Sequence, residues 1–273
     1  MQNMLRKVKT VLRVFKDGGV TSIFQLCLLK LNSTLDIVIE HRGSMRLDHC
    51  NFRLDSPVVS PHIRRLFFFN RYERPERRAL ERFLDPKLPV VELGSAVGVI
   101  ACLANKKLHD PYRHVAVEAN PDLLPLLREN RRLNDCHFTI MHRALAYGSR
   151  EKTFYRASNY LGSNALKPCG IPIQVQTVIL KQILETFGFE ICTLICDIEG
   201  GESDLIAHEL DVIRERVKTL ILEVHDWLLA PKVVRTLLLD LEESGFVPVH
   251  KEEYNYVFIN MNMIEQRMKL IKP

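Results

Sequence analysis

The chain has 273 residues, of which 47% are apolar and 26% are charged, and its formal net charge at pH 7 is +5. This balance is ordinary for a soluble globular protein, and the length suits one large domain or a domain with an extension. Because no dense run of lysine and arginine with interleaved aromatic residues accompanies the mild positive charge, we expect no nucleic-acid partner.

The spacing of the cysteines and the lengths of the apolar runs indicate the cellular compartment in which the protein resides. Seven cysteines are scattered along the chain without a CxxC pair, which disfavours a disulfide framework and a zinc site. No secretory signal is visible, and no apolar run approaches the length of a membrane span. We therefore expect a cytoplasmic protein with reduced thiols. The sequence does not indicate its oligomeric state.

The first predicted element is a basic amphipathic helix near the N-terminus. Apolar residues recur at helical spacing in MLRKVKTVLRVF, lysines and arginines fill the other face, and Gly18-Gly19 ends the helix. Such a helix could pack on the main domain or make peripheral contact with an anionic membrane surface. Residues 46–70 are expected to be extended and rich in loops. We assign residues 1–70 to an N-terminal helical and extended extension and residues 71–273 to the main domain.

The main domain alternates short apolar runs with helical patterns. Helices are predicted at 74–86, from the glycine turn through 104, and at 120–133, 179–187, 203–214 and 232–244. Strands are predicted at 90–93, 114–119, 137–145, 191–198 and 217–225, with a hairpin around 152–157 and 171–178 and a closing antiparallel pair at 246–251 and 254–260. This alternation predicts a doubly wound α/β fold, with a mostly parallel seven-stranded sheet and an antiparallel last strand.

A glycine turn joins the first predicted strand to its helix. Gly94 and Gly98 lie in the strand–turn–helix context of a nucleotide site, but the middle glycine that lets a backbone approach a pyrophosphate is absent. Glu118, at the end of the second strand, could accept hydrogen bonds from both ribose hydroxyls of an adenosine, or it could cap the following helix. Glu92, just before the turn, suits a cationic ligand better than a phosphate. S-adenosylmethionine, with its sulfonium and amino group, fits these residues.

Acidic residues follow the fourth strand of the predicted parallel sheet. Asp197, Glu199 and Glu202 would face the same crevice as Gly94, because ligands of an open parallel sheet lie outside the carboxyl ends of its strands. Part of this acidity caps the next helix. Asp197 could take a proton from a substrate hydroxyl, orient that hydroxyl, or bind a divalent cation.

The next strand repeats the pattern with Glu223 and His225 at its end. His225 could be a general base or a hydrogen-bonded structural residue, and Trp227 beside it could form a wall of the substrate pocket or pack in the core. We take Asp197, Glu199 and His225 as the candidate catalytic residues. No residue is assigned to a metal, although Asp197, Glu199 and Glu223 could together hold a divalent cation.

Five segments resemble the FkbM family of methyltransferases in order and spacing: VVELGSAVG, AVEANPDLLPLLRENRRLN, RALAYGSREKTFY, CDIEGGESDLI and LILEVH. The resemblance covers roughly Tyr72 to Glu223, and its most specific part is the DIEGGE block combined with VEANP. The first loop departs from the family's common G-x-N-x-G pattern, with Ser95-Ala96-Val97 between its glycines.

The resemblance implies a class I, S-adenosylmethionine-dependent methyltransferase fold. It also implies methyl transfer mostly to hydroxyl groups of sugars or small metabolites. By position it implies cofactor contacts from Glu92, Gly94, Ser95, Gly98, Glu118, Ala119, Asn120, Arg143 and Ala144, with the last two flanking the adenine. We therefore expect O-methylation of a small-molecule or glycan acceptor.

Three other functions compete with this expectation. A nucleic-acid methyltransferase is disfavoured because the fourth strand ends in Asp-Ile-Glu-Gly, not in an Asn/Asp-Pro-Pro-aromatic run, and an acidic crevice would repel phosphates. The altered glycine loop favours a non-catalytic binding or scaffold protein, but the presence of Glu92, Glu118 and Asp197 together opposes it. An NAD-dependent oxidoreductase lacks its pyrophosphate glycine.

Overall fold

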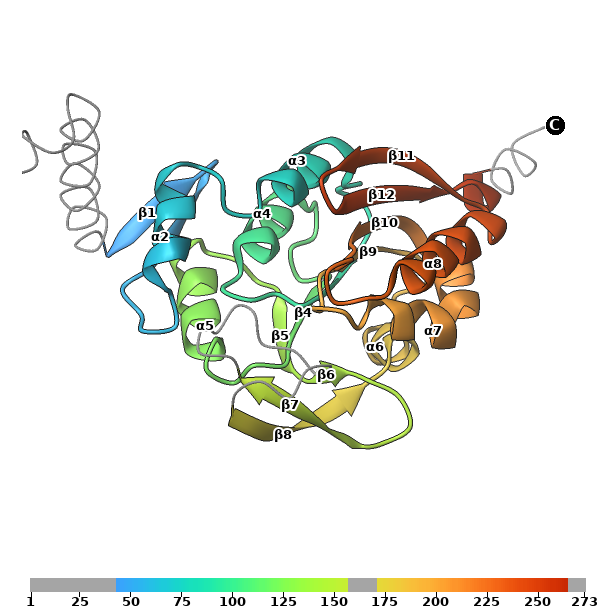
Figure 1. Cartoon of the computed structure of the whole chain (residues 1–273). Coiled ribbons are helices and arrows are strands. Elements are labelled where there is room, and N and C mark those ends of the chain that lie inside the picture. The colour runs from blue at the N-terminus through green and yellow to red at the C-terminus, as the bar shows by residue number, and fades with distance from the viewer. Residues whose placement is uncertain (1–42, 157–170, 265–273) are drawn as a thin grey trace, which may run out of the picture.

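The computed structural model describes residues 43–156 and 171–264, and a single large sheet forms its centre (Figure 1). The predicted basic helix near the N-terminus falls outside these residues. None of the helices in the described ranges is long and apolar enough to cross a membrane.

The central sheet has seven strands in the order β11-β12-β10-β9-β3-β4-β5. Their bounds are β3 Val90–Leu93, β4 His114–Glu118, β5 Thr139–His142, β9 Cys192–Cys196, β10 Val217–Glu223, β11 Phe246–Glu252 and β12 Asn255–Asn260. Neighbouring strands from β10 to β5 pair in parallel, and β12 pairs antiparallel with both β10 and β11. The predicted seven-stranded, mostly parallel sheet with an antiparallel last strand is therefore confirmed.

Helices cover both faces of this sheet. Their bounds are α2 Pro61–Phe68, α3 Arg74–Phe83, α4 Val99–Lys107, α5 Leu124–Leu133, α6 Leu180–Phe187, α7 Glu202–Arg216 and α8 Pro231–Glu243. One core cluster joins Val90 of β3 to apolar residues of α2, α3, α4 and α5, and the other joins Val91 and Leu93 to α6, α7 and α8 (Figure 1). Because helices cover both faces of the sheet, β3, β4 and β9 are buried along their whole length, as expected of a parallel sheet.

Two small sheets complete the described chain. Strands β1 Ser44–Leu47 and β2 Cys50–Arg53 form a hairpin. Strands β7 Glu151–Arg156 and β8 Ile171–Val178 pair antiparallel, which confirms the predicted hairpin, and β8 also pairs with the short β6, Ala144–Leu145.

The expectation of an extended, loop-rich segment at 46–70 is wrong in part, because this segment contains part of a hairpin and the helix α2. Its prolines do not prevent a helix: Pro61 stands in the first turn of α2, where proline is favoured, and the Ser60 hydroxyl accepts the N–H of Ile63 at 3.3 Å as the N-cap. Phe52 and Phe67 belong to the same core cluster as the helices of the main domain. The division of the chain at residue 70 stays a prediction.

Candidate functional site

A crevice opens at the carboxyl ends of β3, β4 and β9, with a volume of about 910 Å³ including its mouth. This position is the switch point of the sheet, because the chain passes from β3 to β4 on one side and β9 lies on the other. The predicted cofactor-binding residues that line the crevice are Gly94, Glu118, Ala119, Asn120, Arg143 and Ala144. Asp197 and Glu199 line it as well. Of the predicted cofactor-binding residues, Glu92, Ser95 and Gly98 do not line it, and neither does the predicted catalytic residue His225.

The glycine turn brings backbone segments into close contact. Gly94 has φ +87°, and a Cβ atom there would lie 1.6 Å from the carbonyl oxygen of Asp197. Gly98 has φ +86°, and a Cβ atom there would lie 2.5 Å from a methyl carbon of Leu127. Ala96 between them has φ +45°, a left-handed conformation that glycine and asparagine tolerate better. Both glycines are therefore required by the fold at the crevice, whichever ligand binds there.

Glu118 is buried at the end of β4, and its carboxylate joins two turns. One oxygen accepts the N–H of Ala96 at 2.8 Å, and the other accepts the N–H of Asn120 at 2.6 Å. Burial raises the pKa of Glu118 to about 7, although the N–H groups of Asn120 and Ala96 oppose this rise. Since each carboxylate oxygen has a second lone pair, Glu118 can still accept hydrogen bonds from a ligand in the crevice.

Glu92 points to the face of the sheet opposite its neighbours Val91 and Leu93, and there it contacts His114. The distance from its Oε2 atom to Nε2 of His114 is 3.2 Å, and both side chains are buried. Burial lowers the pKa of His114 to about 3 and raises that of Glu92 to about 8. The imidazole is therefore neutral. His114 was not predicted as part of this region, because the sequence pattern does not show which residues of β3 and β4 stand side by side.

A second, smaller cavity adjoins the crevice. Its volume is about 230 Å³ on the same measure, and it shares Gly94 and Asp197 with the crevice. Glu92 and Ser95 line this cavity together with Glu73 and Glu76 at the start of α3.

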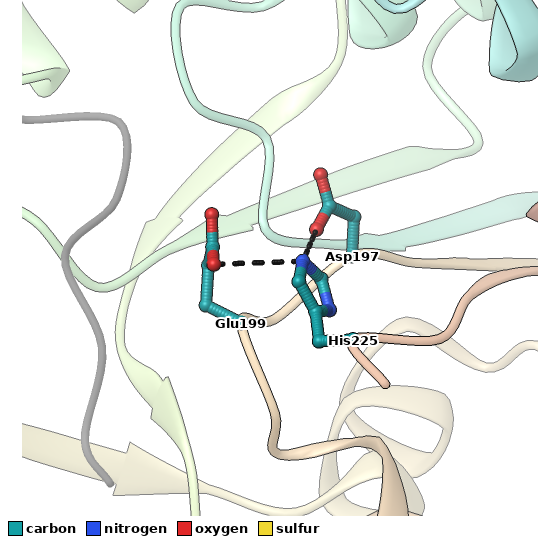
Figure 2. A group of neighbouring side chains, drawn as sticks. All are labelled: Asp197, Glu199 and His225. Atoms are coloured by element: carbon teal, nitrogen blue, oxygen red, sulfur yellow. Dashed lines mark ion pairs between the residues drawn. The ribbon is translucent and has the colours of Figure 1, made fainter. Parts of the chain in front are cut away.

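The three candidate catalytic residues lie together. Figure 2 shows His225 between the carboxylates of Asp197 and Glu199, and its Nε2 atom is 3.3 Å from the Oδ1 atom of Asp197 and 3.5 Å from an oxygen of Glu199. Its Nδ1 atom is 2.8 Å from Glu202. Burial alone would lower the pKa of His225, but the hydrogen bond with Glu202 and the charges of Asp197, Glu202 and Glu199 raise it to about 10. At neutral pH His225 is therefore an imidazolium that donates from Nδ1 to Glu202 and forms ion pairs through Nε2 with Asp197 and Glu199, and not a free base.

Glu202 does more than supply charge to the start of α7. It is fully buried, and its Oε1 atom accepts the N–H groups of Ile198 at 3.2 Å and Gly200 at 3.1 Å as well as contacting His225. These bonds hold the loop after β9 and present Glu199 to the crevice. Glu199 itself has a left-handed backbone, with φ +53°, and burial raises its pKa to about 7 while His225 opposes this rise.

The side chains that could bind a cation form two groups, and Asp197 belongs to both. One group is Asp197 with Glu199 and His225, and the other is Asp197 with Glu76 and Glu223; within each, the donor atoms lie within 4.8 Å of one another. Glu76 was missed because RPERRALERF has so many charges that its acids look solvated. Its spacing was the available signal: Glu76 precedes Ala79 and Leu80 by one helical turn, which places it on the buried face.

Comparisons with known proteins add little about activity. No protein-family model matches the chain, and no curated protein sequence does. Among solved structures, the chain is similar to M. jannaschii TYW2 in complex with AdoMet (14% identity, covering 79% of this chain and 82% of that one, TM-score 0.41). It is also similar to Aeropyrum pernix fibrillarin with natively bound S-adenosyl-L-methionine (11%, 68% and 73%, TM-score 0.38).

A third similar structure is a protein of the NADB-Rossmann superfamily from Streptococcus agalactiae, with 13% identity, 67% of this chain covered and a TM-score of 0.40. The match spans 65% of the length of that protein. Likenesses at this level give no argument about activity, and the resemblance to the FkbM family stays a prediction.

Proposed function

We propose that this protein is an S-adenosylmethionine-dependent O-methyltransferase that acts on a hydroxyl group of a sugar, a glycan or a small metabolite. The observation that carries the proposal is the crevice at the switch point of the sheet, which Glu118, Asp197 and Glu199 line together. A nucleoside with a positively charged reactive centre matches this arrangement of a ribose acceptor and acidic groups.

The residues of the crevice fit such a cofactor. Glu118 is held by two backbone N–H groups and would accept the ribose hydroxyls. The apolar side chains of Leu145 and Phe154 stand near Ala144 in the lining, where an adenine ring could pack. Carboxylates at the other side complement a sulfonium and an ammonium group. When bound, S-adenosylmethionine supplies the electrophilic methyl group.

The side chains of the loop after β9 supply the remaining chemistry. A hydroxyl acceptor must lose its proton, and the carboxylate of Glu199 or Asp197 is the group that would take it. The charged ring of His225 forms ion pairs with both carboxylates, and His225 is a positioning residue in this proposal. Correct placement of two reactants can lower a barrier by about 7–11 kcal/mol, and a general base can add roughly 10²–10⁴-fold. One carboxylate next to the acceptor is therefore sufficient.

Aromatic side chains beside His225 support a ring-shaped acceptor. Trp227 is 52% exposed, and its ring lies 4.9 Å from that of His225 and 4.8 Å from that of Tyr254, which is also exposed. A tryptophan that served only the core would be more deeply buried. The two rings offer flat apolar surfaces on which the apolar face of a sugar could lie.

Calorimetric titration of the full chain with S-adenosylmethionine, S-adenosylhomocysteine and NAD tests the proposal. We expect micromolar binding of both sulfur nucleosides and its loss in Glu118→Ala. Glu81→Ala, which removes an exposed carboxylate that does not line the crevice, should bind as the wild type does.

Circular dichroism shows whether each variant is folded. Absence of nucleoside binding to folded wild type would overturn the proposal in favour of a non-catalytic scaffold, and tight NAD binding would favour an oxidoreductase.

A further inference from the structure

The smaller cavity contains several acidic groups, of which Asp197 lies beside the imidazolium of His225. Its lining residues include Glu73, Glu76, Glu92 and Asp197, and among the described residues that line it there is no lysine or arginine. Arg77, the neighbour of Glu76 in α3, donates instead to Asp48 at 2.7 Å and to backbone carbonyl groups. Burying several carboxylates together is unfavourable unless something neutralises them.

Glu76 is the most unusual of these groups. Its side chain is 3% exposed, yet no hydrogen bond or ion pair joins it to any residue within 43–156 or 171–264. Its neighbour Glu73 also has a buried, unpartnered oxygen in this part of the chain. Although His225 approaches the Oδ1 atom of Asp197 to 3.3 Å, the two are not aligned for a hydrogen bond, and Oδ1 is likewise unpartnered among the described residues.

Three carboxylates that lie close together come from separate parts of the fold. Glu76 lies in α3, Asp197 directly after β9 and Glu223 at the end of β10, and one oxygen of each lies within 4.8 Å of the others. Oxygens bound to one hard divalent cation, at about 2.0–2.6 Å from it, lie no more than about 4–5 Å apart. Glu76 and Asp197 also line the smaller cavity, whereas Glu223 does not; this cavity, at about 230 Å³ against about 910 Å³ for the crevice, suits an ion better than a nucleoside.

We propose that Glu76, Asp197 and Glu223 bind a divalent cation beside the cavity that Glu73 and Glu92 also line. The proposal does not rest on methyl transfer. It does bear on the catalytic residues, because a cation held by Asp197 leaves Glu199 as the carboxylate free to accept a proton in the crevice.

Binding of Mn²⁺ to the full chain, freed of metal by EDTA and dialysis, tests this site. Electron paramagnetic resonance reports free Mn²⁺, and competition with Mg²⁺ and Ca²⁺ follows from the same signal. We expect one site in the wild type and at least a tenfold weaker site in Glu76→Gln. Glu81→Gln is the matched control, since it makes the same change at an exposed position of the same helix, and it should bind as the wild type does.

Two further variants distinguish this site from its neighbours. Glu223→Gln should weaken Mn²⁺ as Glu76→Gln does, and it replaces that variant should Glu76→Gln not fold. Glu199→Gln should leave binding within about threefold of the wild type. Loss of Mn²⁺ binding in Glu199→Gln with normal binding in Glu76→Gln would overturn the proposal and place the ion between Asp197, Glu199 and His225.

Thermal unfolding provides a readout besides affinity. Mn²⁺ should raise the melting temperature of the wild type, whereas Glu76→Gln should melt at or above the wild-type temperature in EDTA and should not respond to the metal. Absence of binding by Mn²⁺, Mg²⁺ and Ca²⁺ at millimolar concentration to folded wild type would also overturn the site. Titration with S-adenosylhomocysteine in EDTA tests the proposed function separately, so each proposal can fail alone.

Discussion

Glu118 links the ionisation of one residue to the stability of the crevice. Its folded-state pKa of about 7 lies above the ordinary value of 4.5, because burial is opposed only in part by backbone N–H groups and the nearby charge of Glu92 adds to the rise. A raised carboxyl pKa means that the folded state holds the proton more tightly than the unfolded state. The resulting stability is fully present below about pH 4.5 and is lost as the pH rises through about 7.

We therefore expect Glu118→Gln, which cannot titrate, to gain stability relative to the wild type as the pH rises. The difference in the free energy of unfolding should move by roughly 2–3 kcal/mol between pH 5 and pH 8. Urea denaturation at several pH values measures it, and subtracting the two proteins removes the titration of all other groups. A difference that stays constant with pH would show that the carboxyl of Glu118 titrates near its ordinary value.

At the scale of elements, a residue of one helix caps the start of another. Glu209 of α7 is buried, and its two oxygens accept the N–H groups of Leu180 and Lys181 at 2.7 Å each, at the start of α6; it also accepts the hydroxyl of Tyr147 at 2.6 Å. The backbone of Glu209 departs from helical geometry, with φ −130°. A carboxylate at a helix N-terminus is favoured by the N–H groups there, so this kink in α7 accompanies the stabilisation of α6.

Replacing Glu209 should therefore destabilise the whole domain. Glu209→Ala leaves buried N–H groups without an acceptor, and we expect the free energy of unfolding to fall by about 2–4 kcal/mol in urea titrations. Asp211→Ala, on the same helix but with an 82% exposed side chain paired to Arg214, should change it by less than about 0.5 kcal/mol. Equal effects of the two substitutions would contradict the capping role.

The helix α3 shows where prediction from the sequence stops. Its existence and approximate bounds follow from its pattern and from Pro86 beyond it. Glu76, however, looks like one charge among many in RPERRALERF. Only the packing of α3 against the sheet places this carboxylate beside Asp197 and Glu223, from strands more than a hundred residues further along the chain. Contacts of this kind depend on how elements pack, and local spacing does not encode that.

At the scale of the whole molecule, the topology made much of the candidate site predictable. Alternating apolar runs predict a parallel sheet, and a parallel sheet brings the carboxyl ends of its strands to one edge. Gly94, Glu118 and Asp197 therefore had to meet, and they do. Two features of Glu92 were not predictable, because they depend on strand register. One is the side of the sheet to which it points, and the other is its contact with the neutral imidazole of His114.

The packing of residues 43–70 gives a prediction about cooperativity. Phe52 of the β1–β2 hairpin is fully buried and contacts Phe67 edge to face in the core cluster that reaches β3 and β10. Phe52→Ala should lower the free energy of unfolding by about 3–5 kcal/mol. The chain has one tryptophan, Trp227, which follows β10, and Figure 1 shows β10 away from the labelled strand β1 of the hairpin. If the hairpin and the sheet unfold together, Phe52→Ala lowers the urea midpoint of Trp227 fluorescence as much as that of circular dichroism.

Arg46→Ala, an exposed change in the same hairpin, should leave both midpoints in place. A fluorescence midpoint unmoved by Phe52→Ala would mean that residues up to 70 form a separate unit.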